Sequence, residues 1–312
     1  MRHVSDADVE ALLDPGDVER LLVEAFRSFG EGRAAIQERV RSVAGAVKLS
    51  TLGAVLPDQG FAGAKVYTTI GGQFRFVIVL FDAVDGAPLA TFDAGAITRL
   101  RTAATSVIAS RYLARPDVRR MALFGAGVQG RAHAIRMAGA YALDEIRVRS
   151  RSADATLCAA IEAECGVAVR PCGAAEALAD AEIVVTASRA RTPLFSGDLL
   201  APGAFVAAIG SSLPDTRELD DRALERASTV AVDWSQQALR EAGDLVLADP
   251  NVLQGKVVQL SDLVTGAAVG RRDADEITVF KSVGIGLQDV ALAGLAWRRL
   301  SQAAGSRSGS GR

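Results

Sequence analysis

The stretch FGAGVQG, residues 124–130, contains the glycine spacing G-x-G-x-x-G between an apolar run and a helical pattern. In such a turn, the first glycine permits a tight bend, the second lets a pyrophosphate approach the backbone, and the third lets the helix pack on its strand. The helix N-terminus offers N–H groups and the positive end of its dipole to phosphates. The stretch therefore predicts a dinucleotide site. Its candidate residues are Gly125, Gly127, Val128, Gln129 and Gly130.

The chain after Arg119 alternates short apolar runs with helical segments as far as about residue 232. Strands are expected in RRMALF, EIRVRS, VAVRPC, EIVVTAS, AFVAAIGSS and STVAVDW, with helices between most of them. This alternation is typical of a doubly wound parallel sheet. The predicted fold class is α/β, with a Rossmann sheet beside a second domain.

The first 115 residues have a different pattern, which predicts a second domain of the α+β class. FRFVIVLFDAVDGAPLATF is two apolar runs joined at Asp85-Gly86, which predicts an antiparallel hairpin. AITRLRTAATSVIASRYLARP predicts a helix that ends before Pro116. Because the sheet pattern ends before the amphipathic C-terminal helix, that helix is expected to return to the first domain. The predicted boundaries are 1–116 with 285–306 for this discontinuous domain, 117–284 for the Rossmann domain, and 307–312 for a disordered tail.

The end of the second Rossmann strand indicates which dinucleotide is preferred. An enzyme that uses NAD is expected to place an acidic residue there for the ribose 2′-hydroxyl. This chain has Ser150, Arg151 and Ser152 instead, which offer hydroxyls and a guanidinium to a 2′-phosphate. The sequence therefore predicts NADP (NADPH), with NAD possible. The alternative reading is that Arg151 is a solvated surface arginine.

Composition excludes several other classes of protein. The net charge is −2 and there is no run of Lys or Arg, which argues against nucleic acid or an anionic membrane as a partner. Three cysteines and two histidines offer little material for a zinc site, a disulfide framework or a Ser-His-Asp triad, so no metal is expected. The N-terminus MRHVSDADVE lacks the apolar core of a signal peptide, and a cytoplasmic location is expected.

Several longer motifs together resemble one known family. AITRLRTAATSVIASRYLARPDVRRMALFGAGVQGRAH, GAKVYTT and IGSSLPDTRELDD are similar to the ornithine cyclodeaminase/mu-crystallin family over nearly the whole chain. GSSLPDTRELDD and the following VAVDWSQQALREAGDLVLA are most similar to its ketimine reductase branch. The resemblance implies a homodimer built through the N-terminal domain, a Rossmann domain beside it, and an active site in the cleft between the two domains.

The resemblance also implies that cationic side chains hold a substrate carboxylate. Lys65 in GAKVYTT and Arg101 in LRTAAT match two of the family's three cations. The third is either Arg39 or Arg41 in QERVRS, and its spacing to Lys65 favours Arg41 slightly. Arg101 is expected in the first turn of its helix, where a guanidinium and a helix N-terminus could face one anion. Lys65 is the leading candidate for the proton donor or for electrostatic control of the imine, because a lysine among other cations can titrate nearer neutrality. Water is the alternative proton donor.

One departure from the family bears on the reaction. Where the cyclodeaminases of the family carry a catalytic Asp, this chain has Ser212, and a serine hydroxyl is no base near neutral pH. Asp215 lies beyond the following proline and is expected to point elsewhere. Reduction of a C=N bond is therefore favoured over cyclodeamination.

Further residues are candidates for the two sites. Thr186 and Ser188 end one predicted strand at the edge where open α/β sheets bind ligands, and Thr102 is a further candidate for a cofactor contact. Lys281 and Ser282 are candidates for the same cleft, with helix capping as the alternative for Ser282. Gln73 and Arg75 either line the substrate pocket or, for Arg75, point outward from a strand.

The function expected from these observations is NADP-dependent reduction of carboxylate-bearing ketimines and imines, including cyclic imino acids, to amino acids. Alternatives are an ornithine or lysine cyclodeaminase that recycles NAD, an amino-acid dehydrogenase of the alanine type, and a non-catalytic NADPH-binding protein like some crystallins. The partners are then small imine or amino-acid molecules.

Overall fold

The computed structural model describes residues 1–309 and divides the chain into two compact units. One unit comprises residues 1–104 and the chain from Gly284 onward, and the other comprises residues 105–283. The first boundary therefore falls within helix α3 (Gly95–Leu113), earlier than the position after Pro116 that the sequence suggested. In the described part of the chain, no helix has both the length and the apolarity needed to span a membrane.

The first unit is built on a seven-stranded sheet. Its strands are β1 (Arg2–Val4), β2 (Ala35–Ile36), β3 (Val40–Ala44), β4 (Val47–Leu56), β5 (Phe61–Ile70), β6 (Gln73–Asp82) and β7 (Pro88–Asp93). They lie in the order β1-β7-β6-β5-β4-β2, with β3 also paired to β4. The predicted hairpin is present as the antiparallel pair β6 and β7.

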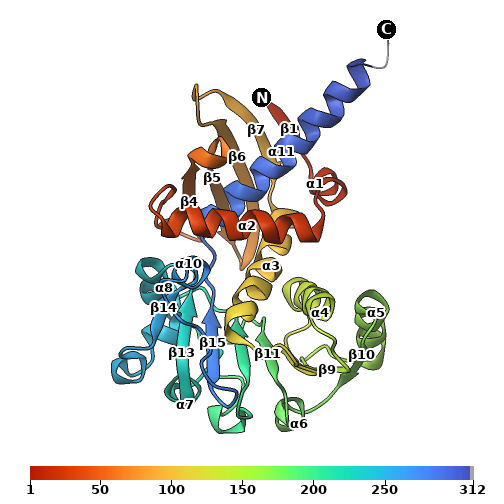
Figure 1. Cartoon of the computed structure of the whole chain (residues 1–312), viewed down its shortest axis with the longest axis vertical. Helices are drawn as coiled ribbons and strands as arrows, with labels where there is room; N and C mark the ends of the chain where they lie inside the picture. Colours follow the sequence, from red (N-terminus) through yellow and green to blue (C-terminus); the bar gives the residue numbers. More distant parts are fainter. Residues whose placement is uncertain (310–312) are drawn as a thin grey trace. The chain divides into compact units, whose positions relative to one another are not determined.

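The two faces of this sheet differ in burial. Helices α1 (Asp6–Leu12), α2 (Pro15–Gly30) and α11 (Gly286–Gly309) belong to the same unit, and α11 packs on β4, β5 and α2 (Figure 1). Alternate residues of β4, from Ser50 to Leu56, are buried, whereas Val47, Leu49 and Val55 between and beside them are exposed. A strand with one covered face shows this alternation.

The second unit contains an eight-stranded sheet in which every pair is parallel. Its strands are β8 (Arg120–Phe124), β9 (Glu145–Arg149), β10 (Ala168–Pro171), β11 (Ile183–Thr186), β12 (Phe205–Ala208), β13 (Ala227–Val232), β14 (Val257–Gln259) and β15 (Ile277–Lys281). The order is β10-β9-β8-β11-β12-β15-β13-β14, which is a doubly wound arrangement.

Helices cover both faces of this second sheet. They are α4 (Val128–Ala140), α5 (Ala155–Cys165), α6 (Ala174–Leu178), α7 (Asp221–Arg226), α8 (Ser235–Glu241), α9 (Gly243–Val246) and α10 (Leu260–Thr265). Ala122, Val184 and Val206 join one core with residues of α6 and α7. Leu123, which points the other way from β8, lies beside Gly130 of α4. The strands are consequently buried on both sides, as parallel sheets require.

Two expectations about the C-terminal part are wrong. The sheet does not end near residue 232, because β15 inserts between β12 and β13 just before the last helix. Residues 307–309, predicted as part of a disordered tail, are helical in α11. The rest of that predicted tail, residues 310–312, lies outside the described residues.

Candidate active site

The glycine-rich turn between β8 and α4 has the geometry that its sequence predicts. Gly125 has φ +99°, and a Cβ there would lie 2.5 Å from the carbonyl oxygen of Ala187. A Cβ on Gly130 would lie 1.9 Å from the carbonyl oxygen of Gly125, so both positions require glycine. Beside Gly127, by contrast, a Cβ would meet no described atom within 4 Å, and this residue caps α4 without a side chain. The turn therefore leaves room for a pyrophosphate at the N-terminus of α4, and its residues fit a dinucleotide.

The segment after β9 lies next to this turn, because the Gly125 N–H donates to the Arg149 carbonyl at 2.9 Å. The Ser150 and Ser152 hydroxyls are 3.3 Å apart. Arg151 is exposed, and it makes no hydrogen bond or ion pair with any residue that the structure describes. Two hydroxyls and an uncommitted guanidinium are thus available beside the dinucleotide turn.

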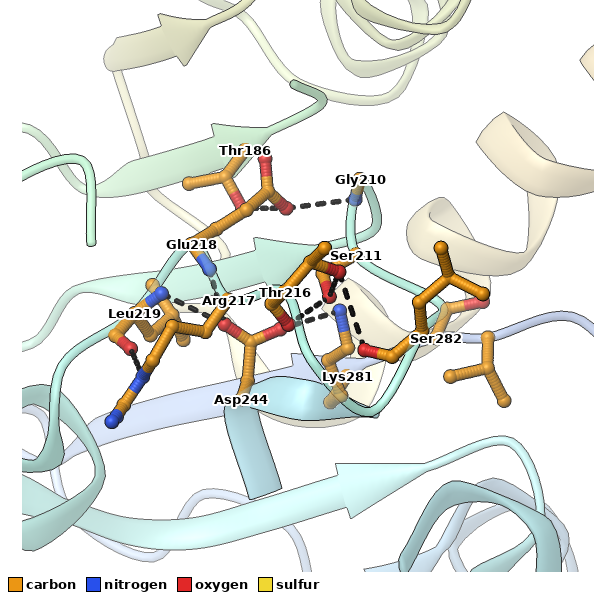
Figure 2. A network of polar contacts seen from close by, with 12 residues as sticks. Thr186, Gly210, Ser211, Thr216, Arg217, Glu218, Leu219, Asp244, Lys281 and Ser282 are labelled. Atoms are coloured by element: carbon orange, nitrogen blue, oxygen red, sulfur yellow. Dashed lines mark hydrogen bonds and ion pairs between the residues drawn. The ribbon is translucent and has the colours of Figure 1, made fainter. Parts of the chain in front are cut away.

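A buried carboxylate joins the ends of two neighbouring strands of the second unit. One oxygen of Glu218 accepts hydrogen bonds from the Thr186 hydroxyl and the Gly210 N–H, both at 2.8 Å (Figure 2). The other oxygen accepts from the N–H and the hydroxyl of Ser188, both at 2.7 Å. Thr186 is the last residue of β11, Ser188 lies just after it, and Gly210 lies just after β12. Both predicted residues are therefore committed to Glu218, which fixes the strand ends where a doubly wound sheet binds its ligand.

A second buried carboxylate, Asp244, holds Glu218 in place. One oxygen of Asp244 accepts from the N–H groups of Glu218 and Leu219, at 2.6 and 2.8 Å. Its other oxygen is 2.8 Å from the Lys281 ammonium, in an ion pair with no solvent exposure (Figure 2). Lys281 thus supports the strand-end network from within the unit. Ser282, in turn, donates to Asp233 at 2.8 Å and does not cap a helix.

The first unit gathers cationic side chains around one buried carboxylate. The ammonium of Lys65, on β5, lies 3.1 Å from Oδ1 of Asp289 and donates to the Thr98 hydroxyl at 2.5 Å. The Arg101 guanidinium lies 3.5 Å from the same Asp289 oxygen through Nε. Lys65 is 3% exposed and Arg101 is 7% exposed, so both are held away from bulk water. Arg101 lies in the second turn of α3, which corrects the expectation that it occupies the first.

Burial lowers the pKa of Lys65 to about 8, and the positive charges of Arg101 and Arg39 act in the same direction. Asp289 opposes this shift by stabilising the ammonium. A lysine with this pKa exchanges a proton near neutral pH, which an ordinary lysine does not. Lys65 is therefore suited to deliver or accept a proton at its Nζ.

The backbone near Gly284 brings the two arginines together. The Arg39 guanidinium donates to the Gly284 carbonyl at 2.7 Å. A Cβ on Gly284, which has φ +74°, would lie 2.7 Å from the Arg101 guanidinium, so Arg101 packs directly on this backbone. Around Lys65, the charges of these two arginines exceed the single charge of Asp289. The cluster can therefore accept an anion such as a carboxylate.

Comparisons with known proteins agree with this geometry. The sequence profile of the ornithine cyclodeaminase/mu-crystallin family matches residues 1–303. The chain belongs to this family. It is 33% identical to ketimine reductase mu-crystallin of Rattus norvegicus over 223 residues, which are 70% of this chain and 68% of the relative.

Two solved structures share the fold over nearly the whole chain. A probable ornithine cyclodeaminase from Bordetella pertussis Tohama I is 55% identical, with a TM-score of 0.96 and 98% of each chain covered. The Delta(1)-pyrroline-2-carboxylate reductase of Thermococcus litoralis, in complex with NADH and L-proline, is 26% identical. Its TM-score is 0.90, with 97% of this chain and 98% of that chain covered. The proteins that this chain resembles thus include reductases and a probable ornithine cyclodeaminase.

The remaining predicted residues are placed as follows. Arg41, in β3, lies opposite Ser50, whose partner in β5 is Tyr67 two residues from Lys65. Cross-strand partners point to the same face, so Arg41 shares a face with Lys65. Arg39 and Arg41 both remain candidates for the third carboxylate ligand. Thr102 lies in α3, where its hydroxyl donates to the Thr98 carbonyl at 2.6 Å.

Ser212 lies in the loop after β12, two residues after Gly210, whose N–H donates to Glu218. Asp215, three residues later, is exposed and forms an ion pair of 2.7 Å with Arg191, which is also exposed. The Asp215 carboxylate is therefore committed to a surface ion pair.

The sequence interpretation missed Asp289, Glu218 and Asp244. Asp289 lies 224 positions from Lys65, in the first turn of an ordinary amphipathic helix, so no local spacing reveals it. Glu218 and Asp244 lie in the motifs that carry the family resemblance, and that was the only signal available for them.

Proposed function

We propose that this chain is an NADP-dependent reductase of C=N bonds in imines and ketimines that carry a carboxylate, including cyclic imino acids. The observation that carries the proposal is Lys65, a buried lysine with a pKa near 8 beside Arg101 and Arg39. The mu-crystallin and pyrroline-2-carboxylate reductase relatives support the same reaction class.

Each group has a defined task in this proposal. Arg101, with Arg39 or Arg41, binds the substrate carboxylate. Lys65 holds a proton at the imine nitrogen, since a protonated imine accepts hydride far better than a neutral one. A bound nicotinamide supplies the hydride. The hydride and the proton together convert C=N to CH–NH, and the carboxylate is unchanged.

An oxidation assay tests the proposal. NADPH consumption is measured with Δ1-piperideine-2-carboxylate, Δ1-pyrroline-2-carboxylate and an equilibrated mixture of pyruvate and methylamine. We expect oxidation with at least one of these imines. If NADPH binds but is not oxidised in the presence of any of these imines, the result would instead favour a non-catalytic binding protein.

Cyclodeamination is the second candidate function, because the Bordetella pertussis relative at 55% identity is a probable ornithine cyclodeaminase. Against it, Ser212 stands at the position of the catalytic Asp and Asp215 is paired with Arg191. Incubation with ornithine distinguishes the two candidates: release of ammonia and proline with no net change in the dinucleotide would replace reduction by cyclodeamination.

The cofactor preference yields a prediction at Arg151. Replacing Arg151 by alanine should raise the KM for NADPH by about tenfold and leave the KM for NADH unchanged, because one charge-assisted contact to a phosphate is worth about 1.4 kcal/mol. Initial rates with each dinucleotide at a fixed imine concentration measure the ratio. Arg149→Ala is the matched control, since it removes an equal charge from an exposed position two residues away. An unchanged ratio in Arg151→Ala would refute the assignment of Arg151.

We also propose a homodimer formed through the exposed face of the first sheet. Apolar side chains between 37% and 61% exposed share this face: Val40, Val47, Leu49, Val55, Val77 and Phe81. A contiguous apolar face of this kind marks an interaction surface, and a second copy would cover it with the same residues.

The dimer proposal predicts that Val77→Asp converts a dimer into a monomer, because two carboxylates would be buried in the interface. Light scattering coupled to size-exclusion chromatography measures the mass. Val43→Asp is the control, since Val43 is exposed but lies on the opposite face of β3. A dimer that persists in Val77→Asp would show that this face is not the interface.

A further inference from the structure

Three aromatic rings form a cluster near the β5–β6 turn. Tyr67 and Phe76 have ring centroids 5.1 Å apart, and Phe74 stacks on Phe76 at 5.6 Å with an interplanar angle of 5°. The Tyr67 and Phe74 centroids are 6.1 Å apart. We call these three residues the aromatic cluster.

The aromatic cluster lies on the same sheet face as the carboxylate-binding cations. In the register of β5 and β6, Lys65 is opposite Ile78, and Tyr67 is opposite Phe76. Since alternate residues of a strand share a face, Lys65, Tyr67 and their partners point to one side. The Lys65 ammonium lies 4.5 Å from the centroid of the Phe76 ring, which places the rings directly beside the proton-carrying group.

Core packing alone does not explain this cluster. Phe26 and Phe92 of the same unit have no exposure, whereas Phe74 is 45% exposed and Tyr67 and Phe76 are half-buried. Nor does the turn need the rings, because Gly71 and Gly72 both have positive φ, which suits a two-residue hairpin loop. The cluster thus presents apolar surface beside a buried cation.

We propose that the aromatic cluster binds the substituent that the imine carries next to its carboxylate, so that the preferred substrates have an aromatic or other large apolar side chain. This inference rests on the proposed reductase function and specifies its substrate class. With the carboxylate held by the arginines and the nitrogen near Lys65, the third substituent of the imine carbon extends along the same sheet face. A second carboxylate in that substituent would replace favourable ring contacts by a negative charge that must be desolvated.

The expected size of the preference follows from the area of the substituent. Burying a phenyl group against apolar surface should raise kcat/KM by about 10- to 100-fold over a methyl group. The exposed ring of Phe74 should supply part of this factor, because its removal uncovers one side of the bound substituent.

The test compares imines that share one amine. Phenylpyruvate, pyruvate and oxaloacetate are each equilibrated with methylamine, and kcat/KM is measured at saturating NADPH for the wild type, Phe74→Ala and Arg75→Ala. We expect the phenylpyruvate imine to exceed the pyruvate imine by at least about tenfold, and Phe74→Ala to reduce that ratio by about fivefold or more. Arg75→Ala is the matched control, since Arg75 lies between Phe74 and Phe76 on the opposite face, and should keep the wild-type ratio.

Two results would overturn the inference: equal kcat/KM for the phenyl and methyl substrates in the wild type, or an equal loss for both in Phe74→Ala. Calorimetric binding of the two products, N-methylphenylalanine and N-methylalanine, separates this inference from the proposed function. Absence of turnover with every imine would overturn the reductase function, whereas tighter binding of N-methylphenylalanine that Phe74→Ala abolishes would still support the aromatic cluster as the binding surface. Equal binding of both products would count against it.

Discussion

Replacing Lys65 by methionine should lower kcat/KM for imine reduction by about 10²- to 10⁴-fold, which is the usual contribution of a positioned acid or base. Methionine retains much of the apolar volume of the lysine stem and removes only the ammonium. The NADPH affinity should not change, because the glycine-rich turn belongs to the other compact unit. Initial rates and fluorescence titration with NADPH measure the two effects separately.

The pH dependence gives the same prediction a second readout. Below about pH 8, Lys65 is protonated and can supply its proton, and it loses this proton as the pH rises through about 8. The kcat/KM for reduction should therefore fall above about pH 8 in the wild type, and oxidation of the amine should rise over the same range. In Lys65→Met this titration should be absent.

Lys48→Met serves as the control for removal of a lysine from the same sheet, since Lys48 lies in β4 opposite Thr69 of β5. It should retain the wild-type pH profile. A Lys65→Met enzyme within tenfold of the wild type, with its alkaline limb intact, would mean that water or another group provides the proton.

The glycine-rich turn and the strands around it could be predicted because their signals are local. Gly125, Gly127 and Gly130 lie between one strand and one helix, and the conformation that each requires follows from that context. Strand β15 was missed for the opposite reason. Its five residues, ITVFK, are all buried and too short to show a clear periodicity, and only the pairing with β12 and β13 distinguishes the segment from the start of a helix.

Side-chain direction was the second limit of the sequence interpretation. The segment FRFVIVLF is an apolar run that fits a strand, but the face of each residue depends on register with β5. For that reason the sequence did not decide whether Arg75 lines the substrate pocket or points outward. The structure pairs Arg75 with Thr68, on the face opposite Lys65. The aromatic cluster has the same origin, because Tyr67 and Phe76 meet only through that register.

Asp289 shows the third limit, which is distance along the chain. Its carboxylate meets Lys65 and Arg101 only after α11 returns to the first sheet. In sequence it resembles any acidic residue in the first turn of a helix, where its negative charge would interact favourably with the helix dipole. A buried carboxylate between two cations can be recognised only from the packed structure.

Replacing Glu218 by alanine should lower the free energy of unfolding by about 3–5 kcal/mol, which is typical when a buried charged group is removed from its partners. The carboxylate accepts four hydrogen bonds and has no solvent exposure, so the buried donor of Thr186 and the partly buried donors of Ser188 and Gly210 would lose their acceptor. Glu218→Gln should lose less stability than Glu218→Ala, because the amide keeps one accepting oxygen. It should still be less stable than the wild type, because its NH2 group faces other donors. Urea denaturation measures the unfolding free energies.

Glu225→Ala provides the comparison. Glu225 is exposed, and its solvated ion pair with Arg222 should contribute less than about 1 kcal/mol to stability. Dinucleotide affinity distinguishes a positioning role from simple stability. Because Glu218 joins the ends of β11 and β12, Glu218→Gln should weaken NADPH binding even at temperatures where the variant is fully folded. If Glu218→Gln bound NADPH as tightly as the wild type, the strand ends would not need this carboxylate to form the site, and its donors would serve the core alone.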